Sequence, residues 1–416
     1  MAFTAIGQSV YLLTGPLIGR LYSPAEFGLY GLFYAFAVTA VGVIFLNYDF
    51  AIPAAANDEE AHELTSGAFA IALLFSPLAG LAMGALIMWG VAGFGDLPVS
   101  APLLMVALLI TQAIAQLLQN WSVRRQQTIA IGKASVTLNA VRGATQVAFG
   151  VLLPSWWVLA AGEVAGRVGN VMHLVRLTPV RLMRGGFRHL FNGRTGATLR
   201  RYRQFPLVLL PSQTVDSGVA FAQSAGLAYF FGASGLGMFF LMRRTLDMPV
   251  AFAFRSLSDV FYARLAQDAR DAPERVRPFF VRSVLLIAAA GFALGIPMML
   301  VSPDLFAFVF GPEWRQAGVL ASIMAPASIM NLAVAPVARV FALTTRPQLR
   351  YWFSAVNLAG TVAALAAVHV WSLDLVWATA GLAATTFSAY AVYFWAGYIA
   401  SAALRGAGAE PEEASA

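Results

Sequence analysis

The sequence predicts an all-α protein that crosses a membrane about twelve times, and three observations lead to this. Of its 416 residues, 59% are hydrophobic and 11% are charged, whereas soluble domains carry about a quarter charged residues. The mean hydropathy is +0.71. The apolar residues also form runs of about 18–25 residues from end to end, which is the length that a helix needs to cross the hydrocarbon layer.

The hydrophobic runs place the individual spans. The expected helices are residues 3–19, 27–46, 65–91, 101–119, 134–153, 155–177, 205–231, 235–260, 279–301, 317–343, 351–370 and 373–401. The first run has neither a cationic lead nor a small-residue cleavage site, so we expect a span and not a signal peptide. The segment Gly232–Gly237, GASGLG, looks like a phosphate loop, but no strand precedes it. We therefore expect a turn there.

Basic residues gather in alternate connections, after the fourth, sixth, eighth and tenth spans. By the positive-inside rule, both termini then lie in the cytoplasm. The acidic segment Asn57–Leu64, NDEEAHEL, would be a cytoplasmic loop, and acidic residues contribute little to that rule. This topology accounts for the net charge of +7, so a nucleic acid partner is not expected.

One long basic connection divides the chain into two groups of six spans. We expect an N-terminal lobe over residues 1–177, a cytoplasmic linker over 178–204, a C-terminal lobe over 205–403 and a disordered polar tail over 404–416. A short repeat relates the groups. Pro24–Phe33 and Ala233–Met242 share an apolar–Gly–apolar–aromatic pattern at an offset of 209 residues, which indicates a parallel repeat.

Polar side chains inside the spans are the main indication of a functional site, because hydrocarbon tolerates them only where they face protein or water. They are concentrated on the fifth to eighth spans, which we expect to line a common cavity. The candidates are Arg142, Glu163, Arg167, Gln213, Asp216, Arg243, Arg244 and Asp247.

Two interpretations of these charges stay open. Glu163 and Arg167 are four residues apart, as are Arg243 and Asp247, and such pairs could be closed ion pairs that only join helices. However, four arginines stand against three carboxylates, and this excess favours an anionic ligand. Arginine suits a pyrophosphate because its planar guanidinium donates bidentate hydrogen bonds and keeps its charge.

Metal and cofactor chemistry has little support in the sequence. The chain has no cysteine, which excludes disulfides, thiolate nucleophiles and cysteine metal sites. The four histidines, His62, His173, His189 and His369, show no metal-ligand spacing. We expect no metal and no cofactor.

The segment Gly15–Phe33, GPLIGRLYSPAEFGLYGLF, resembles bacterial polysaccharide-transporter proteins, the O-antigen and exopolysaccharide flippases of the multidrug/oligosaccharidyl-lipid/polysaccharide exporter superfamily. The matching positions are Arg20, Ser23, Pro24, Glu26, Phe27 and Gly28. The second half resembles the family again over Tyr229–Gln267, where Arg244 and Pro249 take its arginine and proline. Arg255 departs from the pattern, because relatives usually carry a small residue there.

The resemblance implies two six-helix lobes around a central cavity in the bacterial inner membrane. It implies a non-enzymatic transporter that moves a polyprenyl-pyrophosphate oligosaccharide to the periplasmic leaflet, with polysaccharide assembly proteins as further partners. Arg243, Arg244, Arg142, Arg167 and Gln213 would then bind the substrate. Asp216, Asp247 or Glu163 would couple transport to protons or sodium, since a buried acid can titrate near neutrality.

Two other functions are alternatives for a chain of this kind. A cation-coupled multidrug exporter of the same fold would favour acidic and aromatic residues in its cavity, and the arginine excess is evidence against it. Membrane polymerases and ligases resemble one another in having a large outward loop. Here the longest outward connection is expected over the 15 residues Ser302–Gln316, half of them apolar, so an enzyme is not expected.

Overall fold

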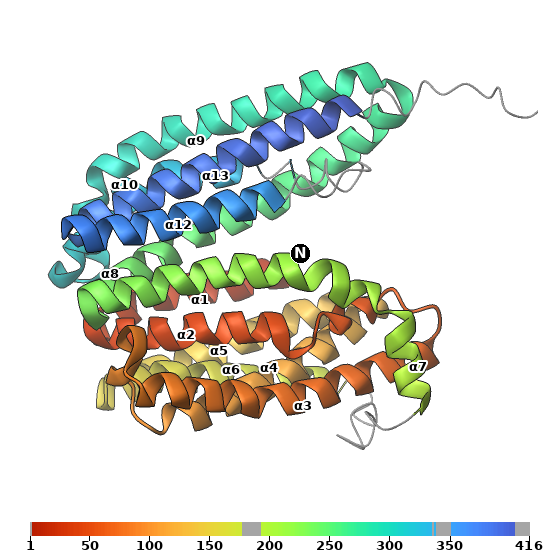
Figure 1. Ribbon diagram of the computed structural model, residues 1–416, viewed down its shortest axis with the longest axis horizontal. Helices are drawn as coiled ribbons and strands as arrows, with labels where there is room; N and C mark the ends of the chain where they lie inside the picture. The colour runs from red at the N-terminus through yellow and green to blue at the C-terminus, as the bar shows by residue number, and fades with distance from the viewer. Residues whose placement is uncertain (1, 177–192, 335–336, 338–350, 404–416) are drawn as a thin grey trace, which may run out of the picture. The chain divides into compact units, whose positions relative to one another are not determined.

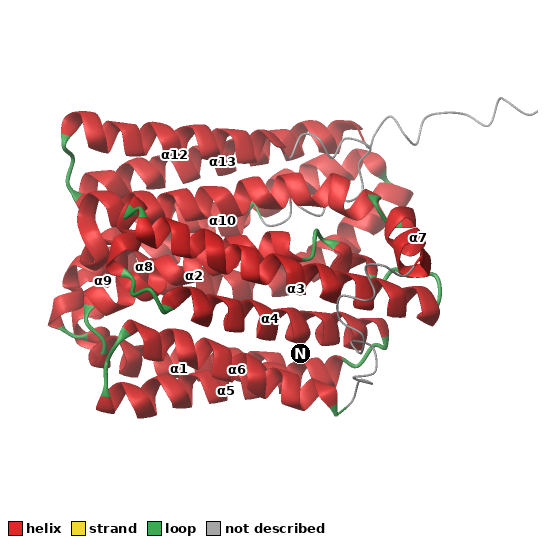
Figure 2. Ribbon diagram, turned by 60° about the horizontal axis from the view of Figure 1, so that its bottom comes forward, coloured by secondary structure: helices red, strands yellow, loops and turns green. Residues whose placement is uncertain are grey.

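The computed structural model describes residues 2–176, 193–334, 337 and 351–403, and every regular element in these ranges is a helix (Figure 1, Figure 2). The helices are α1 (Ala2–Leu21), α2 (Pro24–Ile44), η1 (Tyr48–Ala51), α3 (Asp58–Met88), η2 (Val91–Asp96), α4 (Ala101–Arg124), α5 (Thr128–Leu152), α6 (Trp156–Val175), α7 (Gly193–Arg201), α8 (Gln204–Asp271), α9 (Pro273–Phe310), η5 (Pro312–Trp314), α10 (Arg315–Ala333), α12 (Tyr351–Trp371) and α13 (Leu375–Ala403). Each predicted span falls on a long helix, with the seventh and eighth both in α8. The predicted all-helical membrane fold is confirmed.

Three predicted segments lie wholly or partly outside the described residues. They are the tail 404–416, most of the linker 178–204 and the end of the tenth span. Within the described part, eight segments are long and apolar enough to cross a membrane by length and composition alone. Helices α5 and α6 are not among the eight, and they carry the charged candidates Arg142, Glu163 and Arg167. These charged side chains reduce the mean hydropathy of α5 and α6, and a helix can carry such charges where other helices cover it.

The chain divides into two compact units. Unit 1 comprises residues 1–237 with 309–311, and unit 2 comprises residues 238–308 with 312–416. The division falls inside α8, so the first part of α8 belongs to unit 1, whereas the sequence predicts it in the C-terminal lobe. The lobe boundaries at residues 177 and 205 stay predictions.

The motif at the start of α2 is a helix-capping motif. Ser23 is the N-cap and accepts a hydrogen bond from the backbone N–H of Glu26, and Pro24 follows at the first helical position. The Glu26 carboxylate reaches the neighbouring helix, where it accepts hydrogen bonds from the backbone N–H of Trp156 and the hydroxyl of Ser155. Glu26 therefore supplies the anion at the N-terminus of α6, where the helix dipole favours negative charge.

The acidic segment that we expected to be a loop forms the first turns of α3, so that expectation was wrong. Asn57 caps the helix by accepting from the backbone N–H of Glu60 at 2.8 Å, and carboxylates are stabilising in a first helical turn. These acids pair with basic residues from α4 and α7. The pairs are Asp58 with Arg124, Glu59 with Arg194 and Glu60 with Arg201. The pairing holds α7, at the end of the linker, against the start of α3.

The predicted turn between the seventh and eighth spans is a break inside α8. Gly232 has φ +67° and ψ −175°, a conformation that glycine adopts far more readily than other residues. The glycine-rich segment thus turns the chain, as expected, and separates two long helical segments.

The first halves of the two repeat segments, Pro24–Gly28 and Ala233–Gly237, lie against each other in unit 1. A Cβ atom added at Gly28 would lie 1.7 Å from the carbonyl oxygen of Ala233, and one added at Gly237 would lie 1.8 Å from that of Pro24. Pro24 and Ala233 are equivalent positions of the repeat, as are Gly28 and Gly237, so the contact is reciprocal. The glycines let the backbones of α2 and α8 approach closely, as small residues do in membrane helix pairs.

The end of α9 corrects another expectation. Residues 302–316 were expected to form an outward connection, but α9 continues to Phe310 and η5 follows directly. The Nε atom of Arg20, the arginine of the motif, donates a 3.0 Å hydrogen bond to the carbonyl of Val309 at this end. A cation there satisfies an unpaired helix-end carbonyl and complements the helix dipole.

Unit 2 has its own apolar core, where α8, α9, α10 and α13 meet. The buried members are Phe261, Leu265, Val276, Phe280, Val284, Ala333, Val334, Val337, Ala396 and Ala400. Two stacked aromatic pairs, Phe261 with Phe279 and Phe280 with Phe394, join its helices.

Candidate functional site

Close packing of α5 and α6 builds the most prominent polar site in unit 1. A Cβ atom at Gly166 would lie 2.8 Å from the carbonyl oxygen of Leu138 and 2.9 Å from Cβ of Arg142. Gly166 and Gly162 stand one helical turn apart on α6, and both face α5. This small-residue face sets the register that brings Arg142 of α5 opposite Glu163 of α6.

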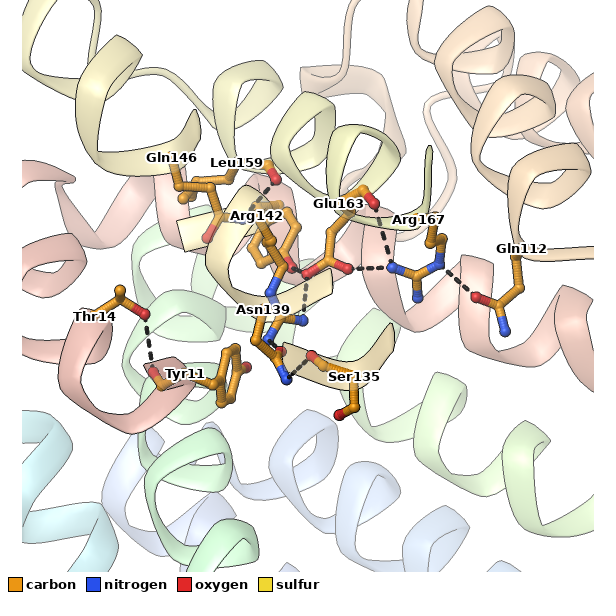
Figure 3. A network of polar contacts seen from close by, with 11 residues as sticks. Tyr11, Thr14, Gln112, Ser135, Asn139, Arg142, Gln146, Leu159, Glu163 and Arg167 are labelled. Atoms are coloured by element: carbon orange, nitrogen blue, oxygen red, sulfur yellow. Dashed lines mark hydrogen bonds and ion pairs between the residues drawn. The ribbon is translucent and has the colours of Figure 1, made fainter. Parts of the chain in front are cut away.

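Glu163 is shared by two arginines, which approach it from opposite sides (Figure 3). Arg142 Nη1 lies 3.1 Å from Oε1, and Arg167 Nη1 lies 2.5 Å from Oε2. The hydroxyl of Tyr30 donates a further 2.8 Å hydrogen bond to Oε1. Glu163 is 1% exposed. The interpretation as a closed Glu163–Arg167 pair is therefore incomplete, because Arg142, on a different helix, binds the same carboxylate.

Neutral groups make further contacts with both arginines. Arg142 Nη2 donates to Asn139 Oδ1 and Arg167 Nε to Gln112 Oε1, each at 2.5 Å (Figure 3). The guanidinium carbon of Arg142 also lies 3.9 Å from the ring centre of Tyr11, which is a cation–π contact. We call Arg142, Glu163 and Arg167 the α5–α6 charge cluster. It carries one more positive than negative group.

Two atoms beside the cluster lack a hydrogen-bond partner in the described structure. They are Nε of Arg142 and Oε1 of Gln146, which sit one helical turn apart and are buried. Gln146 uses its amide nitrogen on the carbonyl of Leu159, at 2.8 Å. Buried polar groups are normally satisfied by protein or by a bound polar molecule. The cluster thus presents one unused donor and one unused acceptor.

The other predicted residues do not join this cluster in the described contacts. Gln213 and Asp216 are half-buried in the first part of α8, in unit 1. There Thr39 of α2 donates to the carbonyl of Ser217 at 3.3 Å. Arg243, Arg244 and Asp247 belong to unit 2.

Arg243 and Asp247 form the predicted i,i+4 ion pair, with 3.3 Å between Nε and Oδ2. Their side chains are 35% and 49% exposed, so this pair is more accessible than the α5–α6 charge cluster. Arg244 is half-buried beside it.

Sequence reasoning missed Tyr11 and Tyr30, which line the α5–α6 charge cluster. Both are aromatic residues with a polar tip inside otherwise apolar helices, and Tyr30 lies within the FGLYG part of the motif. Buried tyrosine hydroxyls usually find a hydrogen-bond partner, so a tyrosine at this depth was the available signal.

A second buried acid, also missed, lies at the end of α2 outside the membrane-spanning segments. Asp49 in η1 is 3% exposed and accepts a 3.3 Å hydrogen bond from Nδ2 of Asn120. Burial raises its pKa from 3.8 to about 6, partly offset by hydrogen bonds from Asn120 and Gln116. Folding therefore favours the protonated acid, and Asp49 destabilises the fold increasingly as the pH rises from about 4 through 6.

We expect Asp49→Asn to stabilise the protein at pH 8 and to have little effect at pH 4. The amide is neutral and can still accept from Asn120, so the gain at high pH approaches about 3 kcal/mol, the equivalent of two pKa units. Thermal unfolding in detergent across this pH range measures it. Asp96→Asn is the matched control, because Asp96 is exposed in η2. An equal shift at both pH values would contradict the assignment.

Comparison with known proteins places this architecture. A family model described as "Polysaccharide biosynthesis protein" matches residues 17–319. No curated protein matches the chain. Among solved structures, an inward-facing multidrug resistance MATE family transporter of the MOP superfamily is similar, with 15% identity, a TM-score of 0.69 and coverage of 97% of this chain and 96% of that one.

A second similar structure is the lipid II flippase MurJ in an inward closed conformation, with 10% identity, a TM-score of 0.64 and coverage of 95% of this chain and 86% of that one. At such identities the likeness establishes the fold. It is the two-lobed fold of these two transporters. Because the family model spans most of the chain and the fold agrees with it, the chain belongs to the polysaccharide biosynthesis protein family.

Proposed function

We propose that this protein is a flippase. Its substrate would be a polyprenyl-pyrophosphate-linked oligosaccharide, which it moves from the cytoplasmic to the periplasmic leaflet of the bacterial inner membrane by alternating access. Family membership links the chain to polysaccharide biosynthesis. The fold is shared with a protein described as a lipid II flippase.

The observation that carries the proposal is the excess positive charge inside the helices. In the α5–α6 charge cluster two arginines share one carboxylate. Charge inside a membrane bundle is costly and typically marks a substrate or ion pathway. A pyrophosphate oxygen can accept from the unused Nε of Arg142, and a sugar hydroxyl can donate to the unused Oε1 of Gln146. The two unused atoms therefore suit a phosphate attached to a sugar.

Arg243 and Arg244 of unit 2 and, separately, Gln213 of unit 1 are further proposed substrate contacts. The half-exposed Arg243–Asp247 pair supports a role for Arg243. Its separation of 3.3 Å is long for an ion pair, so a pyrophosphate that accepts two hydrogen bonds can replace the carboxylate. Of the three proposed coupling acids, Glu163 is held by two guanidinium groups and a hydroxyl. Asp216 and Asp247 are less enclosed and are the better candidates for proton or sodium coupling.

The proposed orientation has both termini in the cytoplasm. Contacts in unit 1 support it, because Arg124 at the end of α4 and Arg201 of α7 both pair with acids at the start of α3. These contacts bring basic connections to one end of unit 1, as the positive-inside rule requires of cytoplasmic segments.

A multidrug exporter is the second candidate, because the fold is also that of a MATE transporter. The charge cluster is evidence against it, since a cationic drug would be repelled by excess positive charge. An enzyme is not proposed. Membrane polymerases and ligases would be expected to have a large outward loop. The extension of α9 to Phe310 shortens the connection in which such a loop would lie.

The test is leaflet translocation in proteoliposomes that contain a polyprenyl-pyrophosphate oligosaccharide, followed with a membrane-impermeant glycosidase. We expect Arg243→Gln/Arg244→Gln to reduce the initial rate by at least about tenfold, because each lost charge-assisted hydrogen bond is equivalent to roughly 1.5–3 kcal/mol. Arg200→Gln is the control, since Arg200 is exposed in α7.

Three outcomes separate the hypotheses. Loss of rate in the double variant alone supports the flippase and the site. An unchanged rate in that variant retains the flippase and removes Arg243 and Arg244 from the site. Efflux of cationic dyes without any glycolipid translocation would establish the exporter instead.

A further inference from the structure

A basic pocket lies between the start of α5 and the end of α6, away from the charge cluster. Its volume is about 460 Å³, and it is lined by Gln127, Ile129, Ala130, Lys133, His173 and Arg176. Four of the six lining side chains carry nitrogen donors, and two of those are permanently cationic at neutral pH. We call it the α5–α6 basic pocket.

The walls of this pocket are held by buried packing just inside it. Ala134 follows Lys133 and Leu174 follows His173, and both are buried against Leu118 of α4. The side chain of Asn170 also donates to the carbonyl of Ala134, at 3.3 Å. The pocket is therefore built between two fixed helices.

The positive charge of the pocket has no protein counter-ion among the described residues. Arg124, Arg194 and Arg201 at the same end of unit 1 each pair with an acid of α3. Lys133, His173 and Arg176 form no ion pair in the part of the chain that the structure describes, and Lys133 only approaches the ring of Phe3, at 5.5 Å. The first N–H groups of α5 add partial positive charge beside Gln127. The pocket thus suits an anion.

Two further features indicate which anion. Ile129 is 65% exposed at the rim, next to Ala130, so one wall is apolar. The buried Oε1 atom of Gln127 has no hydrogen-bond partner in the described structure, so a ligand hydroxyl could donate to it. The pocket lies where both helices reach the cytoplasmic interface in the proposed topology. Basic pockets between helices on that side typically bind anionic lipid headgroups.

We propose that the α5–α6 basic pocket binds the headgroup of an anionic glycerophospholipid of the cytoplasmic leaflet. Lys133 and Arg176 contact the phosphate, Gln127 accepts from a headgroup hydroxyl, and Ile129 lies along the glycerol and upper acyl chain. This lipid is not the transported substrate, so the proposal rests on the proposed orientation but not on the flippase assignment.

The test is native mass spectrometry of the full-length protein titrated with phosphatidylglycerol, with phosphatidylcholine as the zwitterionic comparison. We expect Lys133→Gln/Arg176→Gln to weaken phosphatidylglycerol binding by about 30-fold, since each basic residue near a membrane surface contributes roughly fivefold. Arg200→Gln/Arg203→Gln is the matched control, because it removes two exposed arginines of the same region that do not line the pocket.

Competitors identify the source of the phosphate. Displacement of phosphatidylglycerol by millimolar inorganic phosphate would overturn the lipid assignment in favour of a soluble anion. If polyprenyl pyrophosphate displaces phosphatidylglycerol from the wild type, and Lys133→Gln/Arg176→Gln no longer binds polyprenyl pyrophosphate, the pocket would be assigned to the substrate instead. Equal lipid binding by the wild type and Lys133→Gln/Arg176→Gln also overturns the proposal. If that variant does not fold, Ile129→Trp tests the pocket by filling it without changing charge, and it should weaken phosphatidylglycerol binding selectively.

Discussion

Replacing Glu163 by glutamine is expected to lower the free energy of unfolding by about 3–5 kcal/mol, because removal of one partner leaves uncompensated charge in a buried ion cluster. Glutamine keeps the size and shape of the side chain but removes the negative charge. Arg142 and Arg167 would then lie close together in α5 and α6 without an anion between them. Denaturant or thermal unfolding of the purified protein in detergent measures the loss.

A second substitution separates charge from packing. In Arg142→Gln/Glu163→Gln the cluster again carries one excess positive charge, as in the wild type, so this double variant should be more stable than Glu163→Gln alone. The interaction energy from the double-mutant cycle of Arg142→Gln and Glu163→Gln should fall at the upper end of the 0.5–3 kcal/mol that is typical of contacting residues. Glu313→Gln, at an exposed position of η5, should change stability by no more than about 0.5 kcal/mol. Equal stabilities of Glu163→Gln and the wild type would show that Glu163 is not the shared counter-ion.

The cluster shows what the sequence could and could not predict. The i,i+4 relation of Glu163 to Arg167 follows from helix geometry and was predicted. The contact with Arg142 spans 21 residues and two helices. It depends on how far α5 and α6 slide along each other, and Gly162 and Gly166 set that register through contacts visible only in three dimensions. The choice between an isolated pair and a shared carboxylate therefore required the structure.

The helices themselves were predictable, because uninterrupted apolar runs of membrane-spanning length have few alternative structures. Their ends were less predictable. The start of α3 was assigned to a loop since hydropathy falls at Asp58, Glu59 and Glu60, yet those carboxylates favour a helix N-terminus and pair with arginines of other segments. The end of α9 was placed early for a related reason. A helix can continue beyond the hydrocarbon layer where local capping and packing support it.

Gly28→Ala is expected to destabilise the protein by about 3 kcal/mol, the upper part of the range for overpacked contacts. The new Cβ atom would lie 1.7 Å from the carbonyl oxygen of Ala233. A backbone oxygen has no rotamer with which to move away, so α2 and α8 must separate. In Gly237→Ala the new Cβ atom would lie 1.8 Å from the carbonyl oxygen of Pro24, with the same consequence. Both variants are measured by unfolding in detergent.

Because the contact is reciprocal, it predicts how the losses of stability at the two glycines are related, in addition to the losses themselves. The two glycines are equivalent positions of the repeat and each meets the backbone at the other segment's start, so the two single variants should lose similar amounts. The double variant should lose little more than either one, because the first substitution already separates the helices. Gly218→Ala is the matched control, since its Cβ atom would meet nothing within 4 Å, and replacing a helical glycine by alanine typically stabilises by up to about 1 kcal/mol. Additive losses at Gly28 and Gly237 would mean that the two glycines serve separate contacts. The repeat would then be a resemblance of sequence without a shared structural role.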